Sequence, residues 1–285
     1  MTAPPRAVDA HHHVWDLAVR DQDWITGEAL APLRRDFTLA DLEPEARANG
    51  VDATVLVQTV TVAEETPELL ALAAGSDLVA GVVGWSDLTA PGLADTLAAL
   101  RELPGGDRLV GLRHQVQGES DPQWLLRDDV LRGLAAVADA GLVYDLVVLP
   151  HQLPAAARAA ARLPGLTFVL DHAGKPPVAS GTTRPWADDL RGLAALPNTV
   201  CKLSGLVTEA DVHRWTADTL RPYADTVLDA FGPGRLMFGS DWPVCRLAAT
   251  YTQVVDTART LTDGLSDTER EAVFATTAER VYGLR

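Results

Sequence analysis

Residues 7–16 read A-V-D-A-H-H-H-V-W-D, a short apolar segment that runs into three consecutive histidines. The run is too short for a purification tag and lies inside apolar sequence, so we assign it to the folded chain. Side chains alternate along a β-strand, so a strand over residues 7–11 would place His11 and His13 on one face and His12 on the other. The segment therefore predicts a strand whose carboxyl end carries two inward-facing imidazoles.

Similar apolar, β-branched runs recur about every 30 residues, which is the size of a βα unit. We predict the further strands at residues 52–58, 78–85, 109–114, 143–149, 167–172, 199–205 and 235–241. Several are nearly continuous apolar runs, as is typical of parallel strands covered on both faces. The segments between them indicate helices, among them residues 127–140 and 155–162, and Ser266 with Glu269 predicts a capping box.

Eight such units in 285 residues predict an α/β fold, a single-domain (β/α)8 TIM barrel over residues 1–285. A doubly wound open sheet is the alternative. Its nucleotide-binding signatures are missing, because no G-x-G-x-x-G follows the first strand and no G-x-x-x-x-G-K-[ST] occurs in the chain. The sequence therefore favours the barrel.

The composition indicates which kinds of molecule the protein binds and where it is located. A formal net charge of −15 disfavours nucleic acid and polyanionic substrates, so a neutral or weakly charged small molecule fits best. No apolar run approaches the roughly 18 residues of a membrane span, and the first residues lack the apolar core of a signal peptide. Two cysteines make no disulfide framework. We expect a cytoplasmic protein without a membrane partner, and an oligomer stays possible.

Chemistry in such barrels lies at the carboxyl ends of the strands, and the unusual polar residues of this chain fall there. Six of the seven histidines lie at predicted strand ends, and for the seventh, His213, we expect no role. Polar residues at or near strand ends are His11, His12, His13, Arg113, His114, His151, Asp171, His172, Lys202, Ser204, Ser240 and Asp241.

Part of this set resembles the site pattern of the amidohydrolase superfamily. The matching elements are H-x-H after the first strand (His11, His13), a histidine after the sixth (His172) and an aspartate after the eighth (Asp241). Longer stretches are similar to the amidohydrolase-related (amidohydrolase 2) branch and to its sugar lactonases of the L-fuconolactonase and L-rhamnonolactonase type. They are D-A-H-H-H-V-W-D, G-L-R-H-Q-V-Q, A-G-L-V-Y-D-L, F-V-L-D-H-A-G-K-P and F-G-S-D-W-P-V, in order between residues 9 and 244.

The resemblance implies a hydrolase of carbohydrate metabolism that opens a sugar (aldono) lactone to the aldonic acid. An aspartate among imidazoles at a barrel mouth suits this reaction. We expect Asp241 to be the general base that takes a proton from the attacking water. The other three catalytic residues would polarise the carbonyl and stabilise the oxyanion, directly or through a metal: His11, His13 and His172.

Many members of the superfamily bind one or two divalent ions, so the resemblance also implies a possible metal shell. In this chain the shell would be His11, His13, His151 and Asp241. Three nitrogens and one oxygen suit zinc best. A dinuclear centre is not expected, because the fourth strand offers Arg113 and His114 where a bridging carboxylate or carboxylated lysine is needed. We therefore expect either no cofactor or one divalent cation.

Further residues are candidates for substrate binding: Arg113, His114, Trp24, Trp124, Lys175 and Trp242. Arg113 could equally pair with a neighbouring aspartate, and His114 should face away from the barrel interior if alternation persists. Trp242 is the favoured apolar wall for a sugar ring. We expect Asp145 to be a buried structural residue and Asp171 to fix a loop.

Three other functions stay open. A lactonase for a pyrone dicarboxylate would need several pocket arginines, and Arg113 and Arg246 are the only candidates. A metal-dependent decarboxylase of the same superfamily would need the complete ligand set. A non-catalytic barrel is the third, and it is disfavoured because packing requires none of these polar residues at a barrel mouth.

Overall fold

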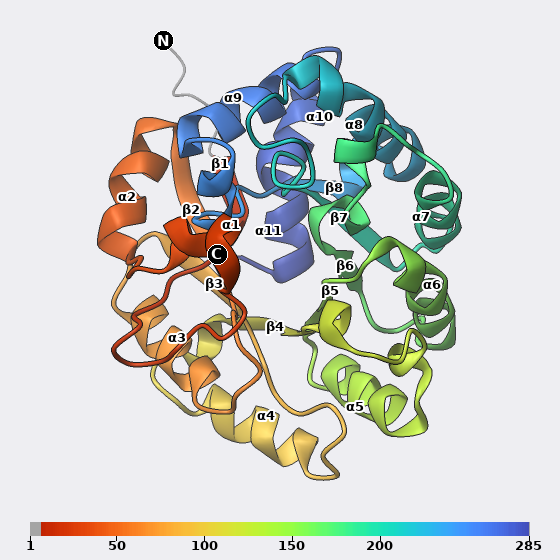
Figure 1. Ribbon diagram of the computed structural model, residues 1–285. Helices are drawn as coiled ribbons and strands as arrows, with labels where there is room; N and C mark the ends of the chain where they lie inside the picture. The colour runs from red at the N-terminus through yellow and green to blue at the C-terminus, as the bar shows by residue number, and fades with distance from the viewer. Residues whose placement is uncertain (1–6, 285) are drawn as a thin grey trace.

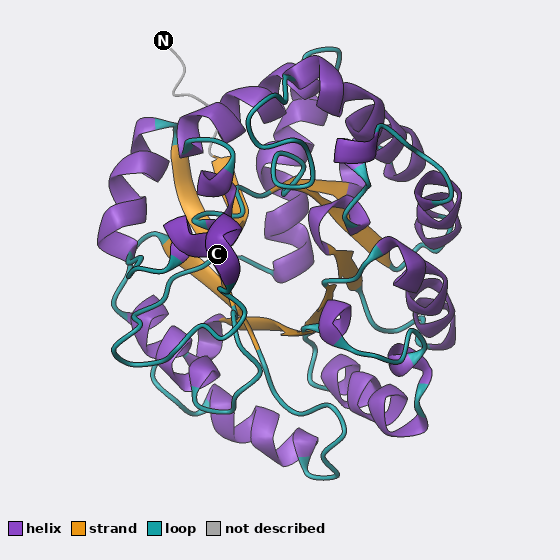
Figure 2. Cartoon of the chain, in the orientation of Figure 1, coloured by secondary structure: helices purple, strands orange, loops and turns teal. Residues whose placement is uncertain are grey.

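The computed structural model describes residues 7–284 and forms a ring of eight parallel strands surrounded by helices (Figure 1, Figure 2). The strands pair in sequence order from β1 to β8. Their bounds are β1 Ala7–His12, β2 Val51–Val57, β3 Val79–Gly84, β4 Leu109–His114, β5 Val143–Leu146, β6 Phe168–Leu170, β7 Thr199–Leu203 and β8 Leu236–Phe238. The predicted single-domain (β/α)8 barrel is confirmed, and the open sheet is excluded.

Most of the helices cover the outside of the ring, whereas α11 packs against the side chains inside it (Figure 1, Figure 2). The helices are α1 Gly27–Leu30, α2 Leu39–Ala48, α3 Glu65–Ala74, α4 Leu93–Arg101, α5 Asp128–Asp139, α6 Leu153–Arg162, α7 Trp186–Ala194, α8 Ala217–Phe231, α9 Tyr251–Leu261, α10 Asp267–Glu271 and α11 Thr277–Tyr282. The predicted capping box opens α10, where the Ser266 hydroxyl accepts the N–H of Glu269. None of the helices in residues 7–284 is long and apolar enough to cross a membrane.

Hydrogen bonds between β1 and the segment after β8 complete the ring. The N–H of His13 donates to the carbonyl of Trp242 at 2.7 Å, and the N–H of Asp241 donates to the carbonyl of His11 at 2.8 Å. These bonds lie at the carboxyl ends of both strands. The closure of the barrel therefore brings the first and last predicted catalytic segments together.

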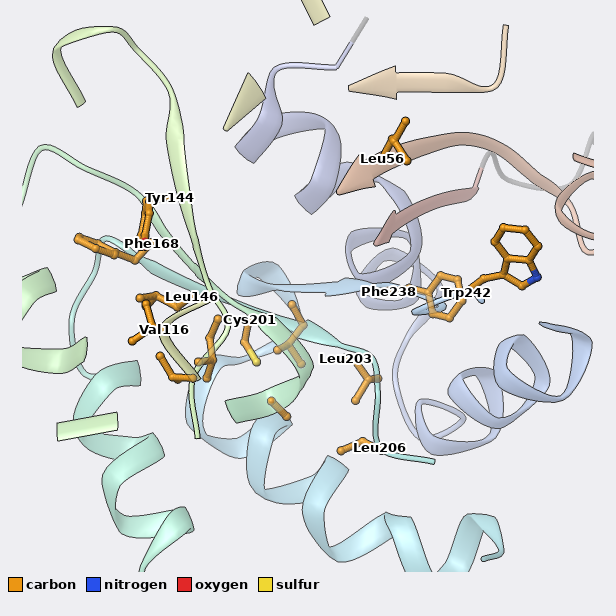
Figure 3. Packing of buried hydrophobic residues seen from close by; sticks show 14 of the residues in the cluster. Leu56, Val116, Tyr144, Leu146, Phe168, Cys201, Leu203, Leu206, Phe238 and Trp242 are labelled. Atoms are coloured by element: carbon orange, nitrogen blue, oxygen red, sulfur yellow. The ribbon is translucent and has the colours of Figure 1, made fainter. Parts of the chain in front are cut away.

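The apolar side chains form two clusters. The larger lies between strands and helices, and Figure 3 shows part of it, including Leu56, Tyr144, Phe168 and Phe238. The smaller fills the inside of the ring and consists mainly of small and β-branched side chains: Val8, Ala10, Ala53, Val55, Val57, Val83, Val143, Val169, Val200 and Met237. A packed interior of this kind gives any site at the barrel mouth a rigid base.

An irregularity in β1 turns His11 inward. Val8 and Ala10 belong to the inner cluster, so strict alternation would turn His11 outward. The pairing of β1 with β2 shifts register between Asp9 and His12, as in a β-bulge, and His11 then also faces the interior. The expected arrangement is present, with His12 turned outward and its Nε2 2.9 Å from Thr54 Oγ1.

Strands β5 to β8 are shorter than predicted, because the chain leaves strand geometry before the predicted ends. After β6 the residues Asp171–Gly174 form a tight turn, in which His172 and Ala173 both have φ of 52°. After β8, Asp241 has φ of 57°. Non-glycine residues seldom adopt this left-handed region, so tertiary contacts must hold these turns.

Helix α5 lies so close to the loop between β3 and α4 that a side chain cannot fit. A Cβ added at Gly133 would lie 2.0 Å from the carbonyl oxygen of Leu88. We expect Gly133→Ala to lower the free energy of unfolding by about 1–3 kcal/mol through overpacking, although alanine is the better helix former. Urea unfolding followed by circular dichroism measures the change.

The matched control is Gly192→Ala in α7, where no atom outside the local helix backbone and the two neighbouring residues lies within 4 Å of an added Cβ. This variant should keep or raise the free energy of unfolding, because only helix propensity changes. Equal stability of Gly133→Ala and the unaltered protein would contradict the close approach of α5.

Candidate active site

A cavity of about 310 Å³ opens at the carboxyl ends of the strands, and six of the predicted residues line it. These are His13, Trp24, Arg113, His172, Lys175 and Asp241. His11 lies directly below, fully buried, with its Nε2 3.1 Å from Nε2 of His13. The structure therefore brings the four residues expected to be catalytic to one point.

His13 is oriented by the backbone of β2. Its Nδ1 lies 2.7 Å from the carbonyl oxygen of Val57. A carbonyl only accepts, so Nδ1 carries a proton, and in the neutral form of the ring Nε2 presents a lone pair to the cavity. Asp241 Oδ1 lies 3.5 Å from that Nε2. Such an imidazole can accept a proton or bind a metal ion.

Asp241 and His172 face each other across the cavity. The Oδ1 atom of Asp241 lies 3.9 Å from His172 Nε2 and 3.8 Å from His11 Nε2. The other ring nitrogen of His172, Nδ1, lies 2.9 Å from the hydroxyl of Ser204. A glycine is needed beside it, because a Cβ on Gly205, which has φ of 67°, would lie 2.8 Å from that Nδ1.

Burial sets the protonation states of these groups. It holds the pKa of His11 well below its usual range and lowers the pKa of His172 to about 4. Burial alone would raise the pKa of Asp241, but interactions with His172 and His13 outweigh it and lower that pKa. At neutral pH the arrangement is therefore a carboxylate that faces neutral imidazoles.

Asp9 fixes the backbone on which Asp241 lies. Its buried carboxylate accepts the N–H of Ser240 at 2.8 Å and the hydroxyl of Tyr251 at 3.0 Å. The Ser240 hydroxyl in turn accepts the N–H of Trp242 at 3.0 Å. These bonds hold the residues on both sides of Asp241. Burial raises the pKa of Asp9 to about 6.

Four charged side chains, which we name the buried charge cluster, lie at the base of the cavity and beneath it: Arg113, Asp145, Asp171 and Lys202. Arg113 Nη1 donates to Asp171 Oδ2 at 2.9 Å, and Lys202 Nζ donates to Asp145 Oδ2 at 2.5 Å. Lys202 Nζ also lies 3.0 Å from Asp171 Oδ1. Two cations and two carboxylates thus balance inside the barrel.

The contacts of the buried charge cluster test the roles expected of Asp145, Asp171 and Arg113. Asp145 is buried and structural, as expected. The expectation that Asp171 fixes a loop is wrong, because the turn after β6 points the side chains of both Asp171 and His172 into the barrel interior. Arg113 has both of the roles that were left open: it pairs with Asp171, and it lines the cavity.

Three residues expected to bind substrate do not line the cavity. Trp242 is fully buried and packs edge-on against Phe37, with 5.5 Å between the ring centroids. It belongs to the larger apolar cluster between strands and helices (Figure 3). His114 faces away because β4 keeps its alternation, with Arg113 inside. Its ring stacks on Trp124 at 4.3 Å and accepts the indole N–H of Trp85 at 3.0 Å.

His151 is not placed to bind a metal ion with the other three residues. Strand β5 ends at Leu146, and His151 lies exposed in the turn Pro150–Gln152 outside the cavity lining. The donor atoms of His11, His172 and Asp241 instead lie within 4.8 Å of one another. With the lone pair of His13 beside them, imidazole and carboxylate donors fit a single divalent cation of the zinc class.

Sequence reasoning missed much of the remaining cavity wall. The residues are Leu30, Thr59, Gln115, Gln117, Val147, Thr208, Glu209, Val244 and Leu247. They lie in the segments that follow the strands, and Gln115, Gln117 and Val244 also lie in stretches that resemble the sugar lactonases. For the other residues only the position after a strand could have indicated a role. It does not tell one loop residue from the next.

Comparison with known proteins gives one consistent family. The family model described as amidohydrolase matches residues 8–284. The chain is 43% identical to an L-fucono-1,5-lactonase of Burkholderia multivorans, covering 97% of this chain and 96% of that protein. It is 42% identical to an L-fucono-1,5-lactonase of Burkholderia ambifaria, covering 86% and 82%.

A solved structure agrees over the same length. The crystal structure of an amidohydrolase from Burkholderia multivorans with bound zinc superposes with a TM-score of 0.92 at 43% identity, covering 98% of this chain and 100% of that one. The chain therefore belongs to the amidohydrolase family.

Proposed function

We propose that this protein hydrolyses a sugar lactone to the aldonic acid, and that L-fucono-1,5-lactone is the first substrate to test. One observation carries the proposal: the ionised Asp241 faces three imidazoles in a cavity of about 310 Å³, a size that suits a monosaccharide lactone. The likeness to two L-fucono-1,5-lactonases supports the same reaction.

The residues suggest how the ring opens. Asp241 accepts a proton from a water molecule as the water oxygen bonds to the lactone carbonyl carbon. Imidazole N–H groups at the site donate to the oxyanion that forms. The bond from the carbonyl carbon to the ring oxygen then breaks, and the ring oxygen takes up the proton to become a hydroxyl. The product is the open-chain acid.

A divalent cation would be held by His11, His172 and Asp241, with His13 beside them, and would polarise the carbonyl as a Lewis acid. The chain's own residues already provide an ionised base and neutral imidazoles next to it. The base therefore has its working charge without the cation.

The cavity has two chemically different walls. Trp24 and Leu30, which follow β1, and Val244 and Leu247, which follow β8, form an apolar wall across neighbouring strands. Most of the other lining residues are polar and follow β2, β4, β6 and β7: Thr59, Gln115, Gln117, and the ion pair of Lys175 with Glu209 at 3.3 Å. A sugar lactone presents hydroxyl groups and C–H faces, and the two walls match these.

The alternatives fit less well. A pyrone dicarboxylate needs cationic partners, but Arg113 is already paired with Asp171, and Arg246 is exposed and bonded to Glu45 at 2.8 Å. The decarboxylase hypothesis required a complete set of metal ligands that includes His151, and His151 does not lie with the other ligands. The cytoplasmic location stays a prediction.

Removing the base should abolish turnover. We expect Asp241→Asn to lower kcat by about 10²–10⁴-fold, the usual contribution of a positioned general base, with the fold retained. A pH-indicator assay on L-fucono-1,5-lactone, corrected for spontaneous hydrolysis, measures the rate. Asp188→Asn on the exposed side of α7 is the matched control and should keep the full rate. Near-normal turnover of Asp241→Asn would remove Asp241 from the mechanism.

Metal removal should leave most of the activity. The ionised Asp241 and the neutral imidazoles provide the base and the hydrogen bonds without a cation. The test is to treat the protein with a chelator, determine residual zinc by elemental analysis, and assay the same sample. A rate that is lost with the metal and restored by zinc would contradict this expectation and make the cation a required cofactor.

A further inference from the structure

We infer that Lys202 determines which nitrogen of His11 carries the proton, and so makes His11 a hydrogen-bond donor to the cavity. Lys202 is then a positioning residue of the active site, although it does not line the cavity. Its effect on the reaction rests on the proposed function, whereas its effect on His11 does not.

The contacts of the lysine give the first part of the argument. Lys202 is fully buried, and its Nζ lies 2.5 Å from Asp145 Oδ2 and 3.1 Å from His11 Nδ1, both aligned as hydrogen bonds. An ammonium group has three N–H donors and no lone pair, so the ring nitrogen that it meets must accept. The Nδ1 of His11 therefore carries no proton, and the neutral ring is protonated at Nε2.

The other side of the ring leads independently to the same assignment. The bond from His13 Nδ1 to the carbonyl of Val57 places the single proton of a neutral His13 ring on Nδ1 and leaves its Nε2 as an acceptor. That acceptor lies 3.1 Å from His11 Nε2, which must then donate. Arg113 Nη1 is a competing donor to His11 Nε2, but at 3.3 Å it lies farther from that nitrogen than His13 Nε2 does. Arg113 Nη1 also has a stronger acceptor in Asp171 Oδ2, at 2.9 Å.

The position of Lys202 is itself fixed from below. The hydroxyl of Tyr282, in α11, donates to Asp145 at 2.9 Å, so this carboxylate cannot turn away from the lysine. The Nζ atom also lies 5.5 Å from the centroid of the Tyr282 ring. A continuous chain of contacts thus runs from α11 through Asp145 and Lys202 to His11.

The position of the proton on His11 decides whether this ring donates a hydrogen bond or binds a metal ion. The Nε2–H of His11 donates to His13 and lies at the base of the cavity, where it can also be shared with a developing oxyanion. Metal binding by the same atom needs a bare Nε2, with the proton moved to Nδ1. Asp171 Oδ1, 3.3 Å from Nδ1, would then accept it, and Lys202 would lose an acceptor. Lys202 therefore favours a hydrogen-bonding His11 over a metal-ligating one.

The experiment is ¹⁵N NMR of the histidine rings, with the His11 signals assigned by their loss in His11→Asn. In the unaltered protein, stripped of metal, we expect the proton on Nε2. In Lys202→Met, which removes the donor, the proton should move to Nδ1 and zinc affinity should rise. In the same variant kcat for the lactone should fall roughly 10²-fold, with KM changed less than threefold.

Tyr282→Phe is the matched control. It removes one hydrogen bond to Asp145 but leaves the contact of Lys202 with His11, so the proton should stay on Nε2. If Lys202→Met fails to fold, the double variant Lys202→Met/Asp145→Asn removes both partners of a buried ion pair, a change that folds more readily than the loss of one.

Two outcomes would overturn the inference: a proton on Nδ1 of His11 in the unaltered protein, or an unchanged His11 in a folded variant that lacks Lys202. The NMR measurement needs no substrate. A protein that opens no lactone yet shows the expected His11 signals would therefore contradict the proposed function and support this inference.

Discussion

The compensation of charge inside the barrel is the interaction on which the site depends. An isolated charge in this interior would cost several kcal/mol, so each cation of the buried charge cluster needs a carboxylate partner. Arg113 has Asp171, and Lys202 has Asp145. Because these four charges cancel, Asp241 contributes a negative charge at the cavity that no cation of the cluster contacts directly. The base thus keeps its charge and its reactivity.

The barrel and the central residues of the site could be predicted from the sequence, because both follow from strand patterns. Apolar runs at regular intervals predicted the strands, and β4 was predicted at its observed bounds, Leu109–His114. The placement of polar residues at strand ends predicted His13, His172 and Asp241 at one cavity. His11 also faces inward, but it does so through a register shift in β1 that alternation alone does not predict.

The errors fall where strands end. Trp242 follows the left-handed residue Asp241, and His151 lies within the turn Pro150–Gln152, so the strand pattern could not say which way either side chain points. Asp171 and His172 both face inward, because the left-handed turn after β6 breaks the alternation that would have separated them. The importance of Lys202 could not be predicted for another reason: its partners come from β1, β5 and the turn after β6, which only the closed barrel brings together.

The bonds that build the site connect positions far apart in the chain. His11 and Lys202 are separated by 191 residues, and Asp9 and Tyr251 by 242. Contacts of such high sequence separation form late and slowly, after local helices are in place. During refolding, the return of catalytic power should therefore lag behind the return of secondary structure. Catalytic activity in this protein therefore requires the complete tertiary fold. A chain that has formed its helices but has not yet packed β1 close to β7 would have no activity.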